Sequence, residues 1–202
     1  MMEYDAEPIR GLPGNLPEGE RILWQGTPDW RVFTRSALFG RWIAGYFALL
    51  ALWSIASGGF GGALASVVAG FATCGLLIGF AMLVEKTTVY TITNRRVVLR
   101  IGVALNKCIN LPLKLIGSAD LRPLGGDHGD IALTTTERHG LGYLMLWPHA
   151  RPLRFSKPQP MLRALPNAQE VAQILADACA MVTRTQPNEE LAVPGGIERA
   201  VA

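Results

Sequence analysis

The segment WIAGYFALLALWSIASGGFGGALASVVAGFATCGLLIGFAMLV, residues 42–84, runs for 43 positions without a charged side chain. The hydrocarbon core of a membrane is about 30 Å thick and is crossed by roughly 20 apolar residues in a helix, so the segment is long enough for two spans. Residues 57–62, SGGFGG, interrupt it with four glycines, which favour a chain reversal. The sequence therefore predicts a transmembrane helical hairpin, with helices at about 41–56 and 63–84.

The charges on either side of this segment predict its orientation. A soluble pair of apolar helices is the alternative to a membrane hairpin, but a soluble helix keeps a polar face and neither of these helices has one. The flanking basic residues are Arg31, Arg35 and Arg41 before the segment and Lys86, Arg95 and Arg96 after it. Because positive residues stay on the cytoplasmic side, both termini are expected in the cytoplasm. The acidic residues at positions 3, 5 and 7 do not fit the basic start of a signal peptide, so no cleavage is expected.

Small residues recur at helical spacing along the second predicted helix. They are Ala65, Ala69, Ala72, Gly75 and Gly79. Such a face lets two helix backbones approach closely in lipid. Two interpretations stay open: the face packs against the first helix, or Gly75 and Gly79 contact another membrane protein or a second copy of the chain.

The remaining residues divide into an arm, a domain and a tail. Residues 1–40 form an N-terminal arm with mixed charge and four prolines, in which only Ile22-Leu23-Trp24 has the pattern of a short strand. The sequence leaves open whether this arm packs on the domain. Residues 41–85 are the hairpin, residues 86–184 form the domain, and residues 185–202 are rich in proline, glycine and charge, which predicts a flexible tail.

The domain is predicted to consist of antiparallel strands closed by one helix. Residues 87–93 and 96–102 are rich in β-branched residues and flank a turn at Asn94-Arg95. Further strands are predicted at 104–111, 115–121, 130–135, 141–147 and 153–155, with a glycine-rich loop at 125–129. Asn167, with Glu170 three residues later, predicts a helix start. One face of that helix is apolar, through Val171, Ile174, Leu175, Ala178 and Val182.

This order resembles a pleckstrin-homology-like (PH-like) β-barrel whose open end is capped by a C-terminal helix. Residues 90–98, YTITNRRVV, resemble the opening hairpin of bacterial PH domains, and residues 17–26, PEGERILWQG, resemble the arm that often precedes a membrane hairpin and such a domain. The acidic start Glu3-Tyr4-Asp5, the segment IRGLP at 9–13, that arm, two spans, one PH-like domain and a short tail together resemble the PuhB-type photosynthetic complex assembly proteins of purple phototrophic bacteria.

The resemblance carries expectations about location and function. It implies a two-span protein of the bacterial inner (intracytoplasmic) membrane with a cytoplasmic PH-like domain. Its role would be non-catalytic: to help assemble the photosynthetic reaction centre and core light-harvesting complex by binding their subunits. The alternative is a membrane-tethered PH-like scaffold for lipid or protein, unrelated to photosynthesis.

The histidines, cysteines and aspartates, residue types that often form cofactor, metal or catalytic sites, predict no such site in this sequence. His128, His139 and His149 lie outside the predicted spans, where a bacteriochlorophyll ligand would not be placed, and are interpreted as surface histidines. Zinc-type spacing is absent, and the three cysteines have no short pairing motif, so reduced cysteines are expected. Asp127 and Asp130 are explained by turn chemistry beside glycine. The chain has no phosphate loop, nucleophile elbow or His-Glu-x-x-His motif, so no enzyme is predicted.

Basic residues are therefore the main candidates for binding. The candidate residues for anionic lipid or a partner are Arg95, Arg96, Arg151, Arg154, Lys157 and Arg163. No acidic residue lies between Glu137 and Glu170, which favours anionic lipid or an acidic partner surface, although a solvated loop would have the same composition. The net charge of +3 fits cytoplasmic flanks of a membrane protein, so nucleic acid is not predicted as a partner.

Overall fold

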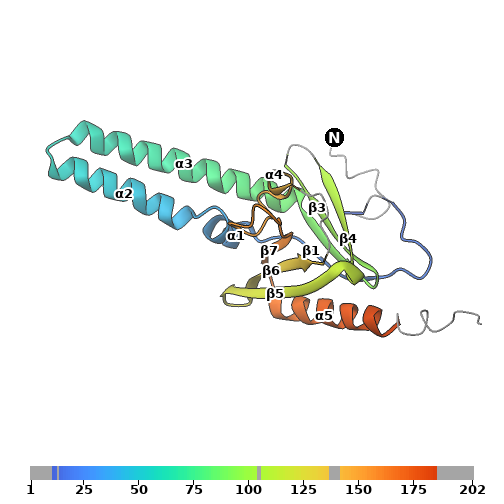
Figure 1. The fold of residues 1–202 in the computed structure, drawn as a ribbon. Helices are drawn as coiled ribbons and strands as arrows, with labels where there is room; N and C mark the ends of the chain where they lie inside the picture. The colour runs from blue at the N-terminus through green and yellow to red at the C-terminus, as the bar shows by residue number, and fades with distance from the viewer. Residues whose placement is uncertain (1–10, 13, 104–105, 137–141, 186–202) are drawn as a thin grey trace, which may run out of the picture.

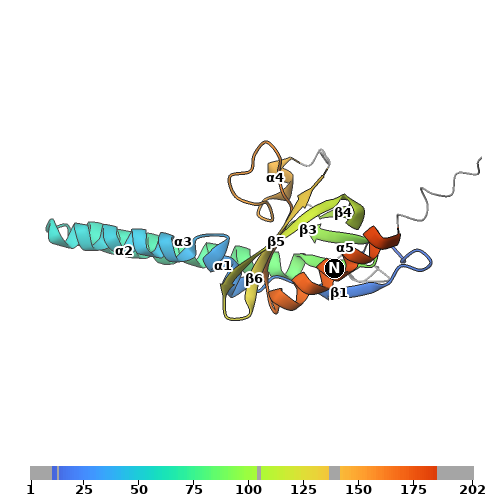
Figure 2. The ribbon, with the colours of Figure 1, turned by 60° about the horizontal axis from the view of Figure 1, so that its bottom comes forward.

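An antiparallel pair of helices, α2 (Gly40–Ala56) and α3 (Phe60–Thr87), extends away from a body of two β-sheets and the helix α5 (Ala168–Thr185) (Figures 1 and 2). This computed structural model describes residues 11–12, 14–103, 106–136 and 142–185. The predicted tail, apart from residue 185, and the first ten residues of the predicted arm lie outside the described residues.

The two apolar helices form where the sequence predicts them, but the reversal between them is shorter. Phe60, Gly61 and Gly62 already belong to α3, so only residues 57–59 connect the helices. Gly58 adopts a φ of 79°, a left-handed conformation that glycine tolerates well. Ser54 Oγ donates a hydrogen bond of 2.6 Å to the carbonyl oxygen of Gly59 and so ties the end of α2 to this turn.

A short helix, α1 (Trp30–Ser36), joins the N-terminal arm to the helical pair, in a region for which the sequence predicts irregular chain. Asp29 begins it, because Asp29 Oδ1 accepts hydrogen bonds from the backbone N–H groups of Arg31 (2.7 Å) and Val32 (3.3 Å). Phe33 of α1 is fully buried in a small apolar cluster with Ala81 and Val84 of α3. This cluster fixes the base of the helical pair on the domain.

The first sheet contains strands from both sides of the helical pair. Its order is β1 (Ile22–Gly26), β2 (Val89–Thr93), β3 (Arg96–Ile101) and β4 (Lys107–Pro112), and all neighbours are antiparallel. Strand β1 precedes α2, whereas β2 follows α3, and Ile22 lies opposite Thr93. The arm therefore packs on the domain, which answers the question that the sequence left open, and the β2–β3 hairpin turns at Asn94-Arg95 as predicted.

The second sheet has the order β5 (Ile116–Gly125), β6 (His128–Thr135) and β7 (Met161–Leu165). A 3-10 helix, η2 (Leu113–Leu115), leads into it from the first sheet. The two sheets are separate, so the predicted single barrel is corrected to a PH-like sandwich of two sheets. Their shared core includes Ile92 and Leu99 from the first sheet, Ile131 and Leu162 from the second, and Leu175 from α5.

Two predicted strands are wrong. Residues 143–146 form a short helix, α4 (Tyr143–Leu146), in which the backbone N–H groups of Met145 and Leu146 donate to the carbonyl oxygen of Gly142. Residues 153–155 are exposed loop, and Leu153 has a φ of 63°. The last strand is instead β7, whose five residues are all buried, so it lacks the alternation by which a half-exposed strand is recognised.

Candidate membrane and partner interface

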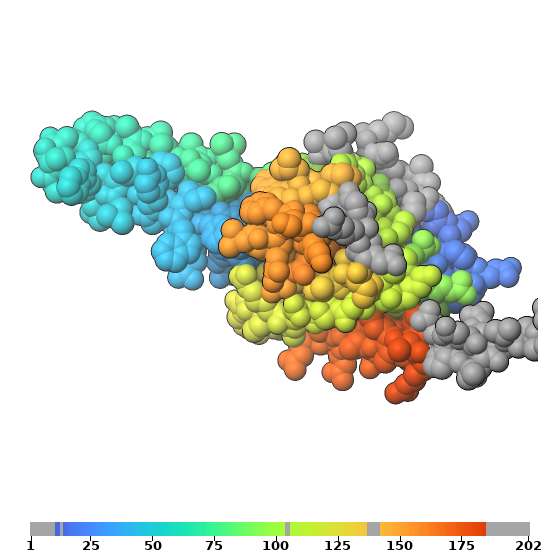
Figure 3. All heavy atoms as spheres, viewed as in Figure 1, coloured from blue at the N-terminus to red at the C-terminus, as the bar shows by residue number. Residues whose placement is uncertain are grey.

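Large apolar side chains cover the outside of the helical pair. Trp42, Trp53, Phe60, Phe71 and Leu76 are each 75–80% exposed. Figure 3 shows the pair protruding from the body, with its outer part uncovered on the face in view. Among the described helices, α3 alone is long and apolar enough to cross a membrane, whereas α1 and α2 pass the same test only as a pair bent by 60°. An exposed apolar surface of this extent marks a membrane or protein contact.

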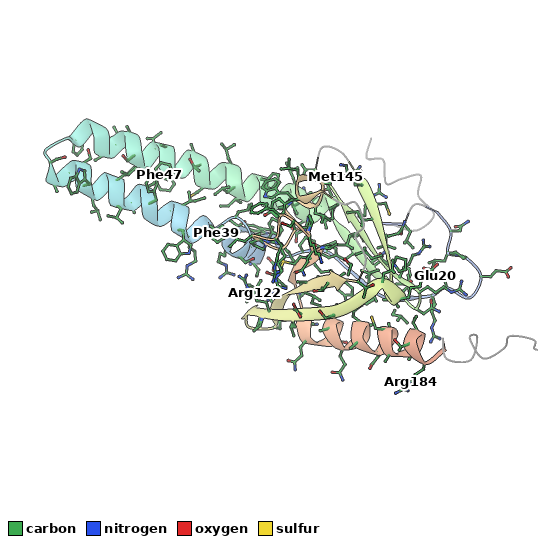
Figure 4. The ribbon with its side chains drawn as sticks, in the orientation of Figure 1. Glu20, Phe39, Phe47, Arg122, Met145 and Arg184 are labelled. Carbon is green, nitrogen blue, oxygen red and sulfur yellow. The ribbon has the colours of Figure 1, made fainter. Side chains whose placement is uncertain are left out.

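The small residues predicted to pack helices face away from α2. Ala65, Ala69, Ala72 and Gly75 are exposed, and Gly79 is half-buried. A side chain added at Gly75 or Gly79 would meet nothing within 4 Å. The helices pack instead through the other face of α3, where a Cβ at Gly70 would lie 2.9 Å from Phe47 Cβ; Figure 4 shows Phe47 between the two helices. Of the two interpretations of the small-residue face, packing within the pair is therefore wrong.

The predicted basic residues do not form one surface. Arg95, Arg154 and Lys157 are exposed. Arg96 Nε and Glu20 Oε1 are 2.8 Å apart in an ion pair, and Arg151 Nη1 lies 2.8 Å from Asp120 Oδ2. Arg96 and Arg151 are thus already neutralised by carboxylates of the same chain.

Arg163 is buried, at 5% exposure, so its assignment to an exposed lipid- or partner-binding set is wrong. It belongs to a buried polar cluster with Tyr90, Asp130 and His149. Tyr90 Oη lies 2.7 Å from His149 Nδ1 and also accepts the backbone N–H of Arg163, at 3.3 Å. Arg163 Nη2 donates to the carbonyl oxygen of Ala150 at 2.9 Å, and Asp130 Oδ1 accepts the backbone N–H of Ala164 at 2.8 Å. The polar cluster therefore joins β2, β6 and β7 to the segment 149–150.

Burial controls the protonation of the polar cluster. It lowers the pKa of His149 to about 3, with the nearby positive charge of Arg163 as a second cause. Burial also raises the pKa of Tyr90 and of Asp130, and in Asp130 the hydrogen bond from Ala164 and the charge of Arg163 counteract that rise. His149 was predicted to lie on the surface but is 1% exposed, and its burial is a tertiary property with no local sequence signal. His128 is half-buried, and His139 lies outside the described residues.

A second exposed surface combines apolar and basic side chains. We call residues 143–157 the apolar-basic loop; its exposed members include Leu144 (88%), Leu153 (83%) and Phe155 (64%) beside Arg154 and Lys157. The ring of Trp147 stacks on Phe80 of α3, with centroids 5.6 Å apart. The apolar-basic loop thus begins next to the base of the helical pair. Among the described residues no group of three or more His, Cys, Asp or Glu side chains is placed to hold a metal ion.

Comparison with known proteins identifies one family. The family described as "Bacterial PH domain" matches residues 39–178, a range that includes the helical pair. A Rhodobacter capsulatus protein named "Uncharacterized 23.7 kDa protein in puhA 5'region" is 39% identical over 210 aligned residues, which cover 99% of this chain and 98% of the relative. A crystal structure of a DUF1696 family protein with a pleckstrin-homology domain, from Shewanella loihica PV-4, has 14% identity and a TM-score of 0.30 over 46% of this chain and 70% of its own.

Proposed function

The chain belongs to the bacterial PH domain family, and from this premise we propose that it is a non-catalytic, membrane-anchored assembly factor for the photosynthetic reaction centre and core light-harvesting complex. The observation that carries the proposal is the relative of matching length that is named for its place in the puhA 5′ region. That place agrees with the resemblance of this sequence to the PuhB-type assembly proteins.

Anchoring rests on the dimensions of the helical pair. At 1.5 Å per residue, the 17 residues of α2 extend about 25 Å. The last turns of α3 are buried against α1 through Ala81 and Val84, which leaves residues 60–80, about 30 Å of apolar helix. Both lengths are close to the thickness of a hydrocarbon core, about 30 Å. A hairpin crossing the membrane twice would bury the apolar surface that is otherwise exposed.

Charge favours one orientation of this hairpin. Arg35, Arg41 and Lys86 lie at the end of the pair that joins the domain, and the turn at residues 57–59 carries no charge. Positive residues are retained in the cytoplasm, so the domain and both termini would be cytoplasmic.

Two surfaces would bind the client subunits. Within the membrane, the outward face formed by Ala65, Ala69, Ala72, Gly75 and Gly79 offers close lateral packing to another helix. At the membrane surface, the apolar-basic loop offers exposed leucine and phenylalanine beside two positive charges. Both contacts would be reversible, as assembly requires, and no chemical step is needed.

The test is deletion of the gene in a phototrophic host, followed by complementation. Deletion should lower reaction-centre and core-antenna absorbance while dark respiratory growth stays unchanged. Normal absorbance in the deletion strain would refute the proposal, and a growth defect in the dark would favour the general scaffold instead.

Matched variants then separate the two surfaces. Gly75→Leu with Gly79→Leu should impair complementation through the small-residue face, and Gly61→Leu, where a side chain also meets nothing within 4 Å, is the control. Arg154→Glu with Lys157→Glu should impair it through the apolar-basic loop, with Arg184→Glu on α5 as the control. Complementation by all variants at the wild-type level would exclude both surfaces.

A further inference from the structure

Four arginines from three parts of the chain line one cavity at the base of the helical pair. The cavity has a volume of about 990 Å³ and lies between α1, the start of α2 and the β5–β6 turn. Its arginines are Arg31 and Arg35 of α1, Arg41 of α2 and Arg122 of β5. None of them was among the candidate binding residues, because only the fold brings β5 next to α1.

The carboxylates of the described residues do not balance the charge of these arginines. Among the described residues, the one carboxylate that lines the cavity is that of Asp29, whose Oδ1 caps α1 and whose Oδ2 lies 3.4 Å from His128 Nε2. Glu85 and Asp130 influence Arg31 and Arg122 electrostatically, but neither forms an ion pair with them in the described part of the chain. Arg31 and Arg35 are also four residues apart on one helix, where like charges repel. An anion from outside the chain would relieve this repulsion.

Hydrogen-bonding groups in the cavity are available for such an anion. Arg35 Nε donates to the carbonyl oxygen of Arg31 at 3.3 Å, and no hydrogen bond within the described part of the chain engages its two terminal nitrogens. Ser36 Oγ is buried at the cavity wall and has no hydrogen-bond partner among the described residues. Guanidinium groups bind phosphate oxygens in pairs of parallel hydrogen bonds, so several arginines and a hydroxyl are suited to a phosphate group.

The cavity wall also has an apolar side that continues onto the helical pair. Val32, Trp42, Gly45 and Leu124 line it, and Trp42 is 79% exposed on the first turn of α2. Tryptophan is enriched at the boundary between lipid and water. A phosphate held by the arginines would therefore lie where the apolar surface of α2 begins.

We propose that this cavity binds the phosphate of an anionic phospholipid headgroup, with the acyl chains of that lipid lying along α2. The proposal rests on the membrane anchoring proposed above. The bound lipid would fix the height and tilt of the domain relative to the membrane. A soluble phosphate ester shares the headgroup chemistry, and an acidic peptide shares the charge, so the experiment includes both.

Native mass spectrometry of the full chain in mild detergent tests the site. Phosphatidylglycerol, phosphatidylcholine and glycerol 3-phosphate are titrated separately, and the preference for phosphatidylglycerol over phosphatidylcholine is measured. Arg35→Gln with Arg122→Gln should lower that preference by about fivefold for each arginine removed. Arg184→Gln, at the far end of α5 from Arg122 in Figure 4, should leave it unchanged. An unchanged preference in the double variant would overturn the site.

Competition and flotation distinguish the remaining outcomes. Displacement of phosphatidylglycerol by an equal concentration of glycerol 3-phosphate would assign the cavity to a soluble phosphate ester. Displacement by a glutamate-rich peptide would assign it to an acidic partner. Either result would overturn the lipid proposal. Wild type and double variant should both float with pure phosphatidylcholine vesicles, since the helical pair is unaltered. Failure of the wild type to float would refute the anchoring itself, whereas flotation with no lipid preference would refute only this site.

Discussion

Acidification from pH 7 to pH 5 should destabilise the domain through His149. This histidine is 1% exposed, and its two ring nitrogens lie 2.7 Å from Tyr90 Oη and 3.4 Å from Thr88 Oγ1. Burial and the charge of Arg163 lower its pKa from 6.5 to about 3. The unfolded chain therefore binds a proton on this residue below pH 6.5, whereas the folded chain does so only near pH 3.

The sign and size of the effect follow from this difference. Between those two pH values the unfolded state holds more protons, so the free energy of unfolding falls as the pH falls through 6.5. For a shift of this kind the loss at pH 5 is about 2 kcal/mol. In a chain of this length it corresponds to roughly 4–8 °C in melting temperature. Asp130 acts in the opposite direction, because burial raises its pKa and the folded state then holds a proton more readily than the unfolded state.

The assay compares wild type with His149→Gln, so that contributions such as that of Asp130 cancel. Thermal unfolding is followed by circular dichroism in mild detergent at pH 7 and pH 5. The variant should lose less stability on acidification than wild type, by about 2 kcal/mol, whatever its stability at pH 7. His128→Gln, which removes a half-buried histidine outside the polar cluster, should retain the acid-induced loss. Equal losses in wild type and His149→Gln would refute the reasoning.

Two further predictions concern the packing of the helical pair and of the arm. Gly70→Leu should lower the melting temperature by separating α2 from α3, because a Cβ at position 70 would lie 2.9 Å from Phe47 Cβ. Gly75→Leu should leave it unchanged, because a Cβ at position 75 would meet nothing within 4 Å. Equal melting temperatures of the two variants would contradict this packing. Glu20→Gln should cost roughly 1–3 kcal/mol in denaturant unfolding, because the Glu20 side chain is only 2% exposed and pairs with Arg96. Glu18→Gln, an exposed neighbour, is the control, and an equal cost there would argue against the ion pair.

The parts of the fold that sequence predicts are those with local patterns. The uncharged run of residues 42–84 gives both helices, the β-branched residues around Asn94 give the β2–β3 hairpin, and the apolar stripe of α5 gives a face that is buried at Val171 and Leu175. Each of these signals is carried by one continuous stretch of sequence. The helical pair follows from the length of the uncharged run, whereas the hairpin and α5 follow from periods of 2 and 3.6 residues.

The parts that sequence missed depend on distant residues or on very short elements. Helix α1 has seven residues, too few for a helical period, and only Asp29 marks its start. Strand β7 is buried on both faces and so shows no alternation of apolar and polar residues. Arg163 in its middle would be expected on the surface from its charge, but it is buried.

Charges near each other in sequence also do not reveal their partners. Arg96 is neutralised by Glu20, and Arg151 by Asp120, from other strands or the arm. The sequence shows where the basic residues lie along the chain, but it does not show which carboxylates they contact in the fold. For the same reason the cavity lined by Arg35 and Arg122 could not be found from spacing.

The position of β1 on one side of the helical pair and β2 on the other has a consequence for synthesis. Residue 22 leaves the ribosome about 70 residues before its partner at residue 93. At roughly 5–20 residues per second this is a delay of about 4–14 s. During that interval the apolar helices emerge, so under the proposed anchoring their insertion into the membrane would precede completion of the first sheet. Strand β1 is therefore made first but can pair with β2 only after both helices have been made. A fragment that begins after α3 would lack β1.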